Sequence, residues 1–235
     1  MSIRVIAHST VLLLALSLNV AWAQSFEEGL AAYDRGDYQT AYEVIRPLAE
    51  GGNAGAQFFL GLMYEDGEGT PQDSSRAAHW YRAAAEQGMD QAQFTLGRMY
   101  YNGQGVSENP SKAARWYRAA AEQGMDQAQS NICVMYLKGE GIPQDFSKAA
   151  RWCRSAAEQG NATAQFDIGL MHAKGEGVIQ DNIAAHMWLN IASANGYQRA
   201  RAVRSLVADQ MPRDAIAEAQ SRARACMDSG YQDCN

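Results

Sequence analysis

Apolar residues recur along this chain at helical spacing, and the whole pattern returns every 36 residues. In each copy an aliphatic residue precedes a ring-bearing residue by four positions; the pairs are Leu60/Tyr64, Leu96/Tyr100, Ile132/Tyr136 and Ile168/His172. A second stretch spaces alanine and tryptophan similarly, at Ala77/Trp80/Ala84, Ala113/Trp116/Ala120, Ala149/Trp152/Ala156 and Ala185/Trp188/Ala192. Residues three or four apart share one face of a helix. Each copy therefore predicts two amphipathic helices whose apolar faces meet.

Glycines and capping residues predict where these helices begin and end. The first helix of each copy is followed by a Gly-x-Gly turn; the glycine pairs are Gly67/Gly69, Gly103/Gly105, Gly139/Gly141 and Gly175/Gly177. Glycine is the usual residue where a helix stops in a left-handed conformation. The second helix follows a good N-cap residue, namely Asp73, Asn109, Asp145 or Asp181. In the second copy these signals predict helices over residues 90–101 and 110–123.

A fixed repeat of this length predicts a solenoid, in which stacked helix pairs bury faces that no pair could bury alone. The period is marked by Gly52, Gly88, Gly124, Gly160 and Gly196, which lie 36 residues apart. Glycines in the first helix should let it approach bulky residues of the second; the pairs are Gly61/Tyr81, Gly97/Tyr117 and Gly169/Leu189. A solenoid exposes an extended surface rather than one closed pocket, which favours binding over catalysis.

The repeated residues closely resemble the Sel-one-like repeat family, a tetratricopeptide-type subclass. In the second copy the resemblance rests on Ala92, Leu96, Gly97, Tyr100, Gly103, Gly105, Val106, Lys112, Ala113, Trp116, Tyr117, Ala120, Ala121 and Gly124. The departures from the pattern are Cys133 for glycine, Cys153 for tyrosine and His172 for tyrosine. This resemblance implies an all-α fold, a right-handed superhelical α-solenoid of antiparallel helix pairs with about twelve helices.

The chain divides into four predicted segments. Residues 1–23 are expected to be a signal peptide and residues 24–51 an N-terminal tetratricopeptide-like capping hairpin. Four 36-residue repeats follow over residues 52–195, and a capping helix pair with a tail occupies residues 196–235. In that last segment we expect helices over Tyr197–Gln210 and Pro212–Met227. They are more polar than the repeats, as the ends of a soluble solenoid must be.

The first 23 residues have the three parts of a secretory signal peptide. Arg4 supplies a positive charge, an apolar stretch follows over residues 11–16, and Ala21-Trp22-Ala23 supplies an A-x-A cleavage signal. The alternative is a membrane anchor, but the apolar stretch is shorter than the ~20 residues that a spanning helix needs. We therefore expect cleavage after Ala23 and a periplasmic or secreted mature protein with no membrane span.

Composition narrows the function further. The formal net charge of −6 argues against a nucleic-acid partner, because a protein that binds nucleic acid needs clustered Lys and Arg. No C-x-x-C, H-E-x-x-H, G-x-S-x-G, S-x-x-K or Walker motif is present, so we expect no metal, no cofactor and no catalytic residues. His172 replaces a repeat tyrosine and is expected in the core, whereas His79 and His186 should face solvent or a neighbouring element.

The four cysteines predict two disulfides, because all of them lie in the segment expected to be exported. Cys133 and Cys153 replace a facing Gly/Tyr pair, and each lies ten residues from Pro143 on either side of the interhelical turn. In an antiparallel hairpin they are at the same height, so a Cα separation near 5–6 Å is expected. This geometry predicts Cys133–Cys153 and Cys226–Cys234. The alternative is four free thiols, with Cys133 and Cys153 packing as small apolar residues.

In tetratricopeptide-type repeats the first helices line a concave surface, and the resemblance implies a binding groove there. The expected groove residues are Phe58, Leu62, Glu65, Phe94, Arg98, Tyr101, Ser130, Val134, Leu137, Phe166 and Leu170. They vary between copies, whereas the apolar positions above hardly vary. The alternative for the phenylalanines is that they pack between adjacent repeats.

The expected function is a non-catalytic scaffold or adaptor of the cell envelope that binds a protein or peptide partner through this groove. An extended peptide in the groove, or a partner helix across it, would fit such a surface. Resemblance also supplies an alternative, because some cysteine-rich secreted members of the family have been linked to penicillin binding and β-lactam hydrolysis. Serine–lysine chemistry of that type is not evident in the sequence.

Overall fold

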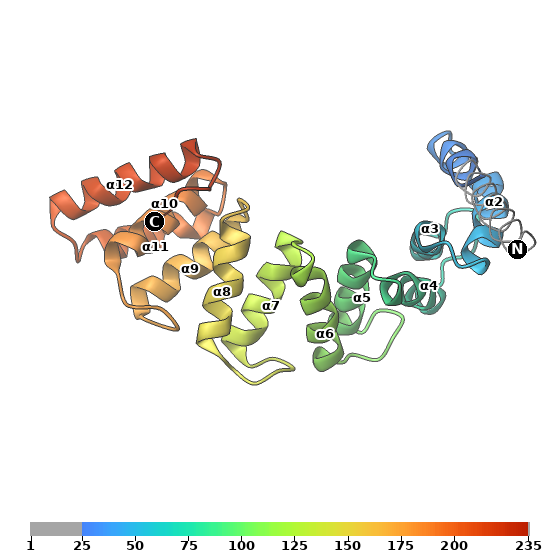
Figure 1. Cartoon of the computed structure of the whole chain (residues 1–235), viewed down its shortest axis with the longest axis horizontal. Helices are drawn as coiled ribbons and strands as arrows, with labels where there is room; N and C mark the ends of the chain where they lie inside the picture. The colour runs from blue at the N-terminus through green and yellow to red at the C-terminus, as the bar shows by residue number, and fades with distance from the viewer. Residues whose placement is uncertain (1–24, 235) are drawn as a thin grey trace, which may run out of the picture. The chain divides into compact units, whose positions relative to one another are not determined.

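The computed structural model describes residues 25–234, and within that range every regular element is an α-helix (Figure 1). The predicted signal peptide lies outside the described residues. The chain forms two compact units, which divide after Glu108. The first unit contains a helix over residues 25–34 and then α2 (Tyr38–Glu50), α3 (Ala54–Asp66), α4 (Ser74–Glu86) and α5 (Asp90–Asn102).

The second unit carries seven helices. They are α6 (Pro110–Glu122), α7 (Asp126–Lys138), α8 (Phe146–Ala157), α9 (Ala162–Lys174), α10 (Asn182–Ala194), α11 (Gln198–Ala208) and α12 (Arg213–Asp228). Residues 25–234 thus contain the expected twelve helices.

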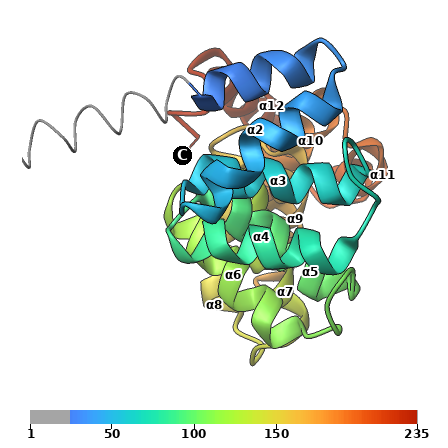
Figure 2. The same ribbon diagram turned by 90° about the vertical axis from the view of Figure 1, so that its right-hand side faces the viewer.

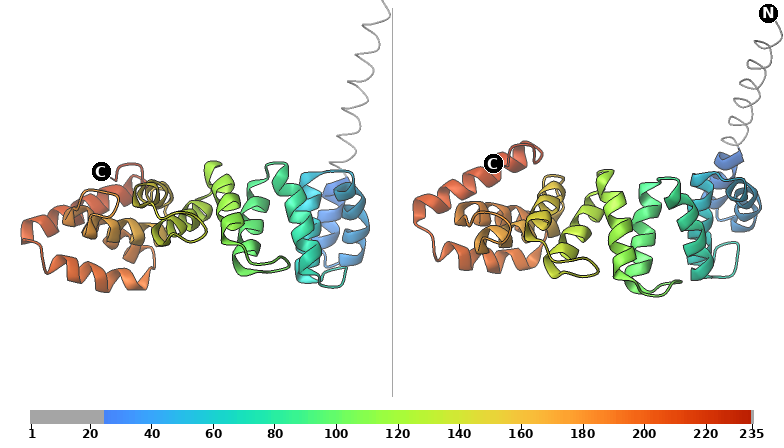
Figure 3. Two further views of the ribbon diagram at one scale, coloured as in Figure 1. Left: turned by 90° about the horizontal axis from the view of Figure 1, so that it is seen from below. Right: turned by 60° about the horizontal axis from the view of Figure 1, so that its bottom comes forward.

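Within each unit, consecutive helices pack against one another. In the first unit α2, α3, α4 and α5 contact in chain order (Figure 2). In the second unit α7 packs on α8 and α9 on α10, while α10 also contacts both α11 and α12 (Figure 3). The all-helical solenoid predicted from the repeat pattern is confirmed.

The helices begin and end where their local sequences predict. The Asp73 carboxylate accepts hydrogen bonds from the backbone N–H groups of Ser75 and Arg76, which caps α4. The helix α3 stops at Gly67, which adopts the left-handed conformation with φ 77° and donates its N–H to Met63. Asp145 and Asp181 cap α8 and α10 in the same way as Asp73. These caps satisfy backbone groups that a helix end would otherwise leave unpaired.

The second glycine of each Gly-x-Gly turn has a role that its helix-stopping partner lacks. A Cβ on Gly141 would lie 2.3 Å from the carbonyl carbon of Pro110, the first residue of α6. At three further turns a Cβ would meet the carbonyl oxygen of the first residue of the preceding second helix at 2.0–2.2 Å; the pairs are Gly69/Tyr38, Gly105/Ser74 and Gly177/Phe146. Backbone contacts backbone here, so no side chain can yield. The turn therefore docks one repeat onto its predecessor.

Glutamines join the repeats at the opposite end of the helix pairs. Gln57 Nε2 donates to the carbonyl of Ala49 in the last turn of α2, at 3.1 Å, and Gln87 Nε2 donates to Gln57 Oε1 at 2.7 Å. The same bond from a first-helix glutamine to the preceding helix recurs at Gln93/Ala85, Gln129/Ala121 and Gln165/Ala157. These buried amides satisfy carbonyls that a helix C-terminus leaves free.

One position in the helix pair is filled in three ways. In the first repeat, a Cβ on Gly61 would lie 2.7 Å from the ring of Tyr81, so glycine makes room for the aromatic ring. In the fourth repeat, Gly169 accommodates Leu189 in the same way. The third repeat places Cys133 and Cys153 there, with Cα atoms 5.3 Å apart, and bonds them. A covalent bond thus replaces packing between small and bulky residues.

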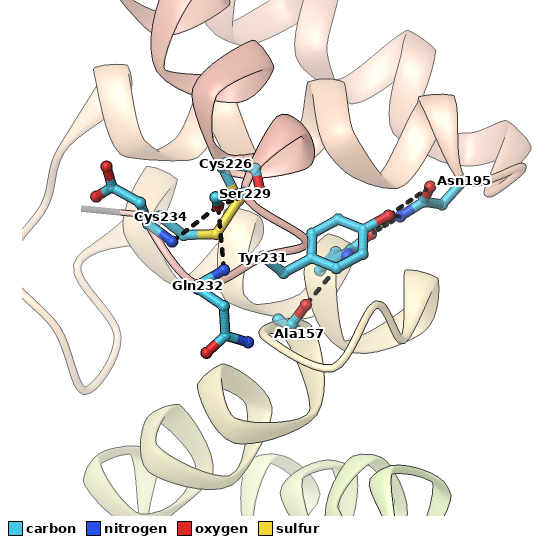
Figure 4. Close-up of a disulfide and its surroundings, with 9 residues drawn as sticks. Ala157, Asn195, Cys226, Ser229, Tyr231, Gln232 and Cys234 are labelled. Atoms are coloured by element: carbon cyan, nitrogen blue, oxygen red, sulfur yellow. Dashed lines mark hydrogen bonds between the residues drawn. A yellow bond between two sulfur atoms is a disulfide. The ribbon is translucent and has the colours of Figure 1, made fainter.

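The C-terminal tail is held by the second disulfide. Cys226 near the end of α12 is bonded to Cys234, with Cα atoms 4.5 Å apart (Figure 4). Between them Tyr231 adopts a left-handed φ of 67° and donates its N–H to the Cys226 carbonyl. Its hydroxyl contacts the side chain of Asn195 (Figure 4). Its ring lies against Gly160. The tail is therefore packed onto the second unit.

The tryptophans correct one expectation, because the repeated tryptophan does not lie uniformly in the core. Trp188 on α10 is buried, with 1% of its surface exposed, whereas Trp80, Trp116 and Trp152 are only half-buried. The difference has a local cause, because α10 is the second helix against which α12 packs. Trp80, by contrast, packs against the core of the first unit with part of its surface exposed.

We predict that Gly141→Ala destabilises the second unit more than Gly139→Ala does. Both glycines have φ 71°, so both alanines carry the left-handed strain of about 1–2 kcal/mol. Only the alanine at 141 also collides with backbone, which should add about 1–3 kcal/mol. Urea unfolding followed by circular dichroism measures both losses. Equal losses would show that the close approach of Gly141 to Pro110 contributes nothing to stability.

Candidate functional site

In the first unit, charged side chains meet on the surface of α3 and α5. The Arg98 guanidinium lies 2.9 Å from the Glu65 carboxylate, and the hydroxyl of Tyr81 on α4 donates to the same carboxylate at 2.6 Å. Burial and the hydrogen bond to Glu65 raise the pKa of Tyr81 well above its usual range. Tyr81 therefore stays a donor and holds Glu65 in place, while Arg98 remains half-exposed.

The apolar residues expected beside this pair divide between surface and core. Phe58 and Leu62 on α3 are half-buried and pack against the core of the first unit, and the Phe58 ring centroid lies 5.4 Å from that of Tyr81. Phe94 and Tyr101 on α5 are also half-buried. Each of these side chains retains some exposed surface beside Arg98 and Glu65.

In the second unit the corresponding positions of α7 and α9 are more apolar. Ser130 and Phe166 are buried, whereas Val134, Leu137 and Leu170 are half-buried. The Phe166 ring stacks on Tyr197 with centroids 4.6 Å apart, and the Arg199 guanidinium lies 5.8 Å from the Phe166 centroid. Phe166 therefore packs between neighbouring elements, as the alternative for the phenylalanines proposed.

Asp167 is a residue of this surface that the sequence reading missed. It lies on α9, and burial raises the pKa of its carboxyl to about 6 despite the opposing charges of Lys138 on α7 and Arg199 on α11. Neither cation forms an ion pair with it. The other copies of the repeat carry Phe59, Thr95 and Asn131 at the same position. The only sequence signal for Asp167 was therefore that one copy has an acidic residue where the others have none.

The histidines are not grouped. His172 is buried, as expected, and its Nε2 lies 3.4 Å from the Arg154 guanidinium. His186 is 3% exposed, so of the two expected environments it faces neighbouring elements, while His79 is exposed and edge-on to Trp80. Burial lowers the pKa of both His172 and His186.

Two further findings concern residues 25–234 as a whole. In that range no three His, Cys, Asp or Glu side chains gather closely enough to hold a metal ion. None of the helices there has the length and apolar character required to cross a membrane.

Comparison with known proteins now gives these surfaces a family context. The Sel1 repeat model matches residues 54–89, 90–125, 126–161 and 162–197. No curated protein matches the chain in sequence. Among solved structures, a Sel1 repeat protein from Oxalobacter formigenes is similar over 88% of this chain and 85% of its own, with 31% identity and a TM-score of 0.73.

A second solved structure is a protective antigen present in uropathogenic Escherichia coli strains that displays an SLR fold. It is 31% identical over 90% of this chain, with a TM-score of 0.70. This chain spans only 50% of the length of that antigen, so the likeness concerns the repeats they share.

We predict that Asp167→Asn removes one pH-dependent component of stability. The folded-state pKa of about 6 exceeds the unfolded value of about 3.9, so this carboxyl contributes stability below about pH 4 that is lost as pH rises through 6. His172 and His186 titrate in the opposite sense in both proteins, so the comparison is between variant and wild type. The melting temperature of the variant should exceed that of wild type at pH 7.5, and this difference should be smaller at pH 5. An equal difference at both pH values would contradict the assignment.

Proposed function

Because the chain belongs to the Sel1 repeat family, whose repeats generally mediate protein interactions, we propose that it is a non-catalytic adaptor for a peptide or protein partner. The proposed binding surface is the exposed face of the first helices in each unit. It comprises α3 and α5 in the first unit and α7 and α9 in the second. The positions that vary between repeats lie on these helices, while the interlocking glycines and glutamines do not vary.

The observation that carries the proposal is the chain of contacts from Tyr81 through Glu65 to Arg98. A half-exposed arginine held by a partly buried carboxylate is fixed in position before a partner arrives. Arginine presents five N–H donors, and Glu65 engages only some of them. The rest can donate to carbonyl or carboxylate groups of a bound peptide. Because the side chain is already held in place, less side-chain entropy is lost when a partner binds.

The neighbouring half-buried rings suit the same role. Phe94 and Tyr101 flank Arg98 on α5, and aromatic and arginine side chains are enriched among residues that dominate binding energies. In the second unit, Asp167 offers an acceptor beside the half-buried Leu170. An extended peptide with both polar backbone groups and apolar side chains fits this mixture better than a purely charged ligand.

We further propose that the protein works outside the cytoplasm, after cleavage behind Ala23. The Cys133–Cys153 and Cys226–Cys234 bonds support this, since structural disulfides persist in oxidising compartments such as the periplasm. The charged, apolar and small-residue order of the first 23 residues supports it independently.

The export proposal predicts a mature chain that begins at Gln24. Intact-mass and N-terminal analysis of the protein recovered from its producing cells measures this directly. The same sample, digested without reducing agent, should yield the two disulfide-linked peptide pairs. Functional protein that retains Met1 in a reducing compartment would refute the proposal.

The binding proposal predicts that Arg98→Glu weakens peptide binding about 10- to 100-fold, which corresponds to the 1–3 kcal/mol typical of an anchoring side chain. Peptides are first selected from a random display library on the full wild-type chain, and their affinities are then measured by calorimetry. Arg35→Glu, which makes the same charge change at an exposed turn residue, is the matched control.

The melting temperature of Arg98→Glu should stay close to that of wild type, because an exposed ion pair contributes only about 0–1 kcal/mol. A substitution of Glu65 is a poorer test, because it would also leave the buried Tyr81 hydroxyl without its hydrogen-bond acceptor. Selected peptides that bind Arg98→Glu and wild type equally would place the binding surface elsewhere.

A further inference from the structure

A pocket outside the proposed groove opens where the third repeat meets its predecessor. It has a volume of about 450 Å³ and lies between α6, α7, α8 and the turn at residues 142–145. Three cations line it, Arg118, Lys148 and Arg151, together with the half-buried ring of Trp152. Asp145 is the only acid among the residues that line it. We call this the repeat-3 notch. The charge of this hollow is opposite in sign to the net charge of the chain, which is −6.

The charges in the notch are only partly compensated. Lys148 pairs with Asp145 at 2.9 Å, and that carboxylate also caps α8. Arg118 donates to the Tyr136 hydroxyl at 2.8 Å, which leaves its charge unneutralised. Arg151 is exposed and makes no hydrogen bond or ion pair with the residues that the structure describes. Two positive charges thus lack an anionic partner beside an aromatic ring.

The chain itself shows how such a notch is covered. Thirty-six residues later the same positions form a hollow around Arg154, His172, Asp181 and Trp188. That hollow is lined on its other side by the C-terminal segment, which contributes Met211, Pro212, Ala215, Arg222 and Cys234. Trp188 is consequently 1% exposed, whereas Trp152 remains half-buried. The fourth repeat receives a polypeptide segment on its tryptophan, and the third receives none from the described chain.

The electrostatics of the two notches are complementary to different occupants. In the fourth repeat Ala184 and Met187 replace Lys148 and Arg151, so two cations are absent. The segment that covers this less basic notch contributes Arg222, whose charge is already paired with Glu218 on the same helix. The repeat-3 notch instead holds two cations without an anionic partner, so it suits a segment that brings in an anion.

We propose that the repeat-3 notch binds an acidic segment of a partner protein. A carboxylate of that segment pairs with Arg151, and an adjacent apolar side chain covers the Trp152 ring, as the C-terminal segment covers Trp188. The site is separate from the proposed groove, because none of the groove residues lines it and its three cations lie on the second helices α6 and α8. A carboxylate is favoured over a lipid surface because the cations surround a hollow beside a ring rather than forming a flat basic face.

The probe is a synthetic peptide with blocked ends in which two glutamates flank a phenylalanine. It is titrated into the ¹⁵N-labelled full chain, and the indole N–H signals are followed by NMR. Trp152→Phe identifies the signal of Trp152. We expect the peptide to shift this signal and to leave that of Trp188 in place. A peptide with lysines in place of the glutamates should produce no shift.

Arg151→Glu should weaken binding of the acidic peptide at least tenfold, as expected when a close charge pair becomes repulsive. Arg224→Glu makes the same charge change on the exposed surface of α12 and should bind as wild type does. Arg98→Glu should also bind normally, which separates this site from the proposed groove.

Three results would overturn the proposal. They are the absence of a Trp152 shift at millimolar peptide, equal affinity for Arg151→Glu and wild type, and an equal response to the lysine peptide. A larger Trp152 shift with anionic phospholipid vesicles than with the peptide would assign the notch to a membrane surface and refute a protein partner.

Discussion

The close approach of each turn to the preceding helix is the contact on which stacking within a unit depends. The second glycine of the turn lies against the first residue of the previous second helix, where even a methyl group has no room. At the other end of the helix pair, a buried glutamine ties the next first helix to the last turn of its predecessor. Each repeat is therefore fixed at one end by a contact between backbones and at the other by an invariant glutamine side chain that bonds to a backbone carbonyl.

This arrangement explains why the middle of the helix pair tolerates such different solutions. One position is occupied by Gly61 with Tyr81, by Cys133 with Cys153 or by Gly169 with Leu189. In all three repeats the first helix ends and the second begins at equivalent residues on either side of the turn. The same freedom extends to the exposed face of the first helices. A repeat can carry a charged array such as Glu65 and Arg98, or buried Phe166 stacked on Tyr197, while the glycine contact at the turn and the glutamine bond stay the same.

The helix boundaries and the packing within each helix pair could be predicted from the sequence, because they depend on local signals repeated at a fixed interval. The cap at Asp73 and the stop at Gly67 follow from residue type, and the pairing of Cys133 with Cys153 follows from their places in a helical hairpin. Contacts between repeats were less accessible. The glycine pairs are identical in sequence, yet only the second glycine lies against the backbone of the preceding repeat's second helix. Asp167 gave only the weak signal of one acid at a variable position, because burial sets its pKa and burial depends on neighbours distant in sequence.

The tryptophans show that a residue repeated in every copy can be buried to a different extent at the end of the solenoid. A ring at the same position in every copy is half-buried in the interior repeats and buried only where α12 and the tail cover it. The Cys226–Cys234 bond and the contact of Tyr231 with Asn195 hold that cover in place. Wherever no such cover exists, a large aromatic surface stays accessible beside cations that vary from copy to copy. A helical repeat of this kind thus offers two independently variable surfaces, one on its first helices and one at its turns, while its interlocking contacts stay constant.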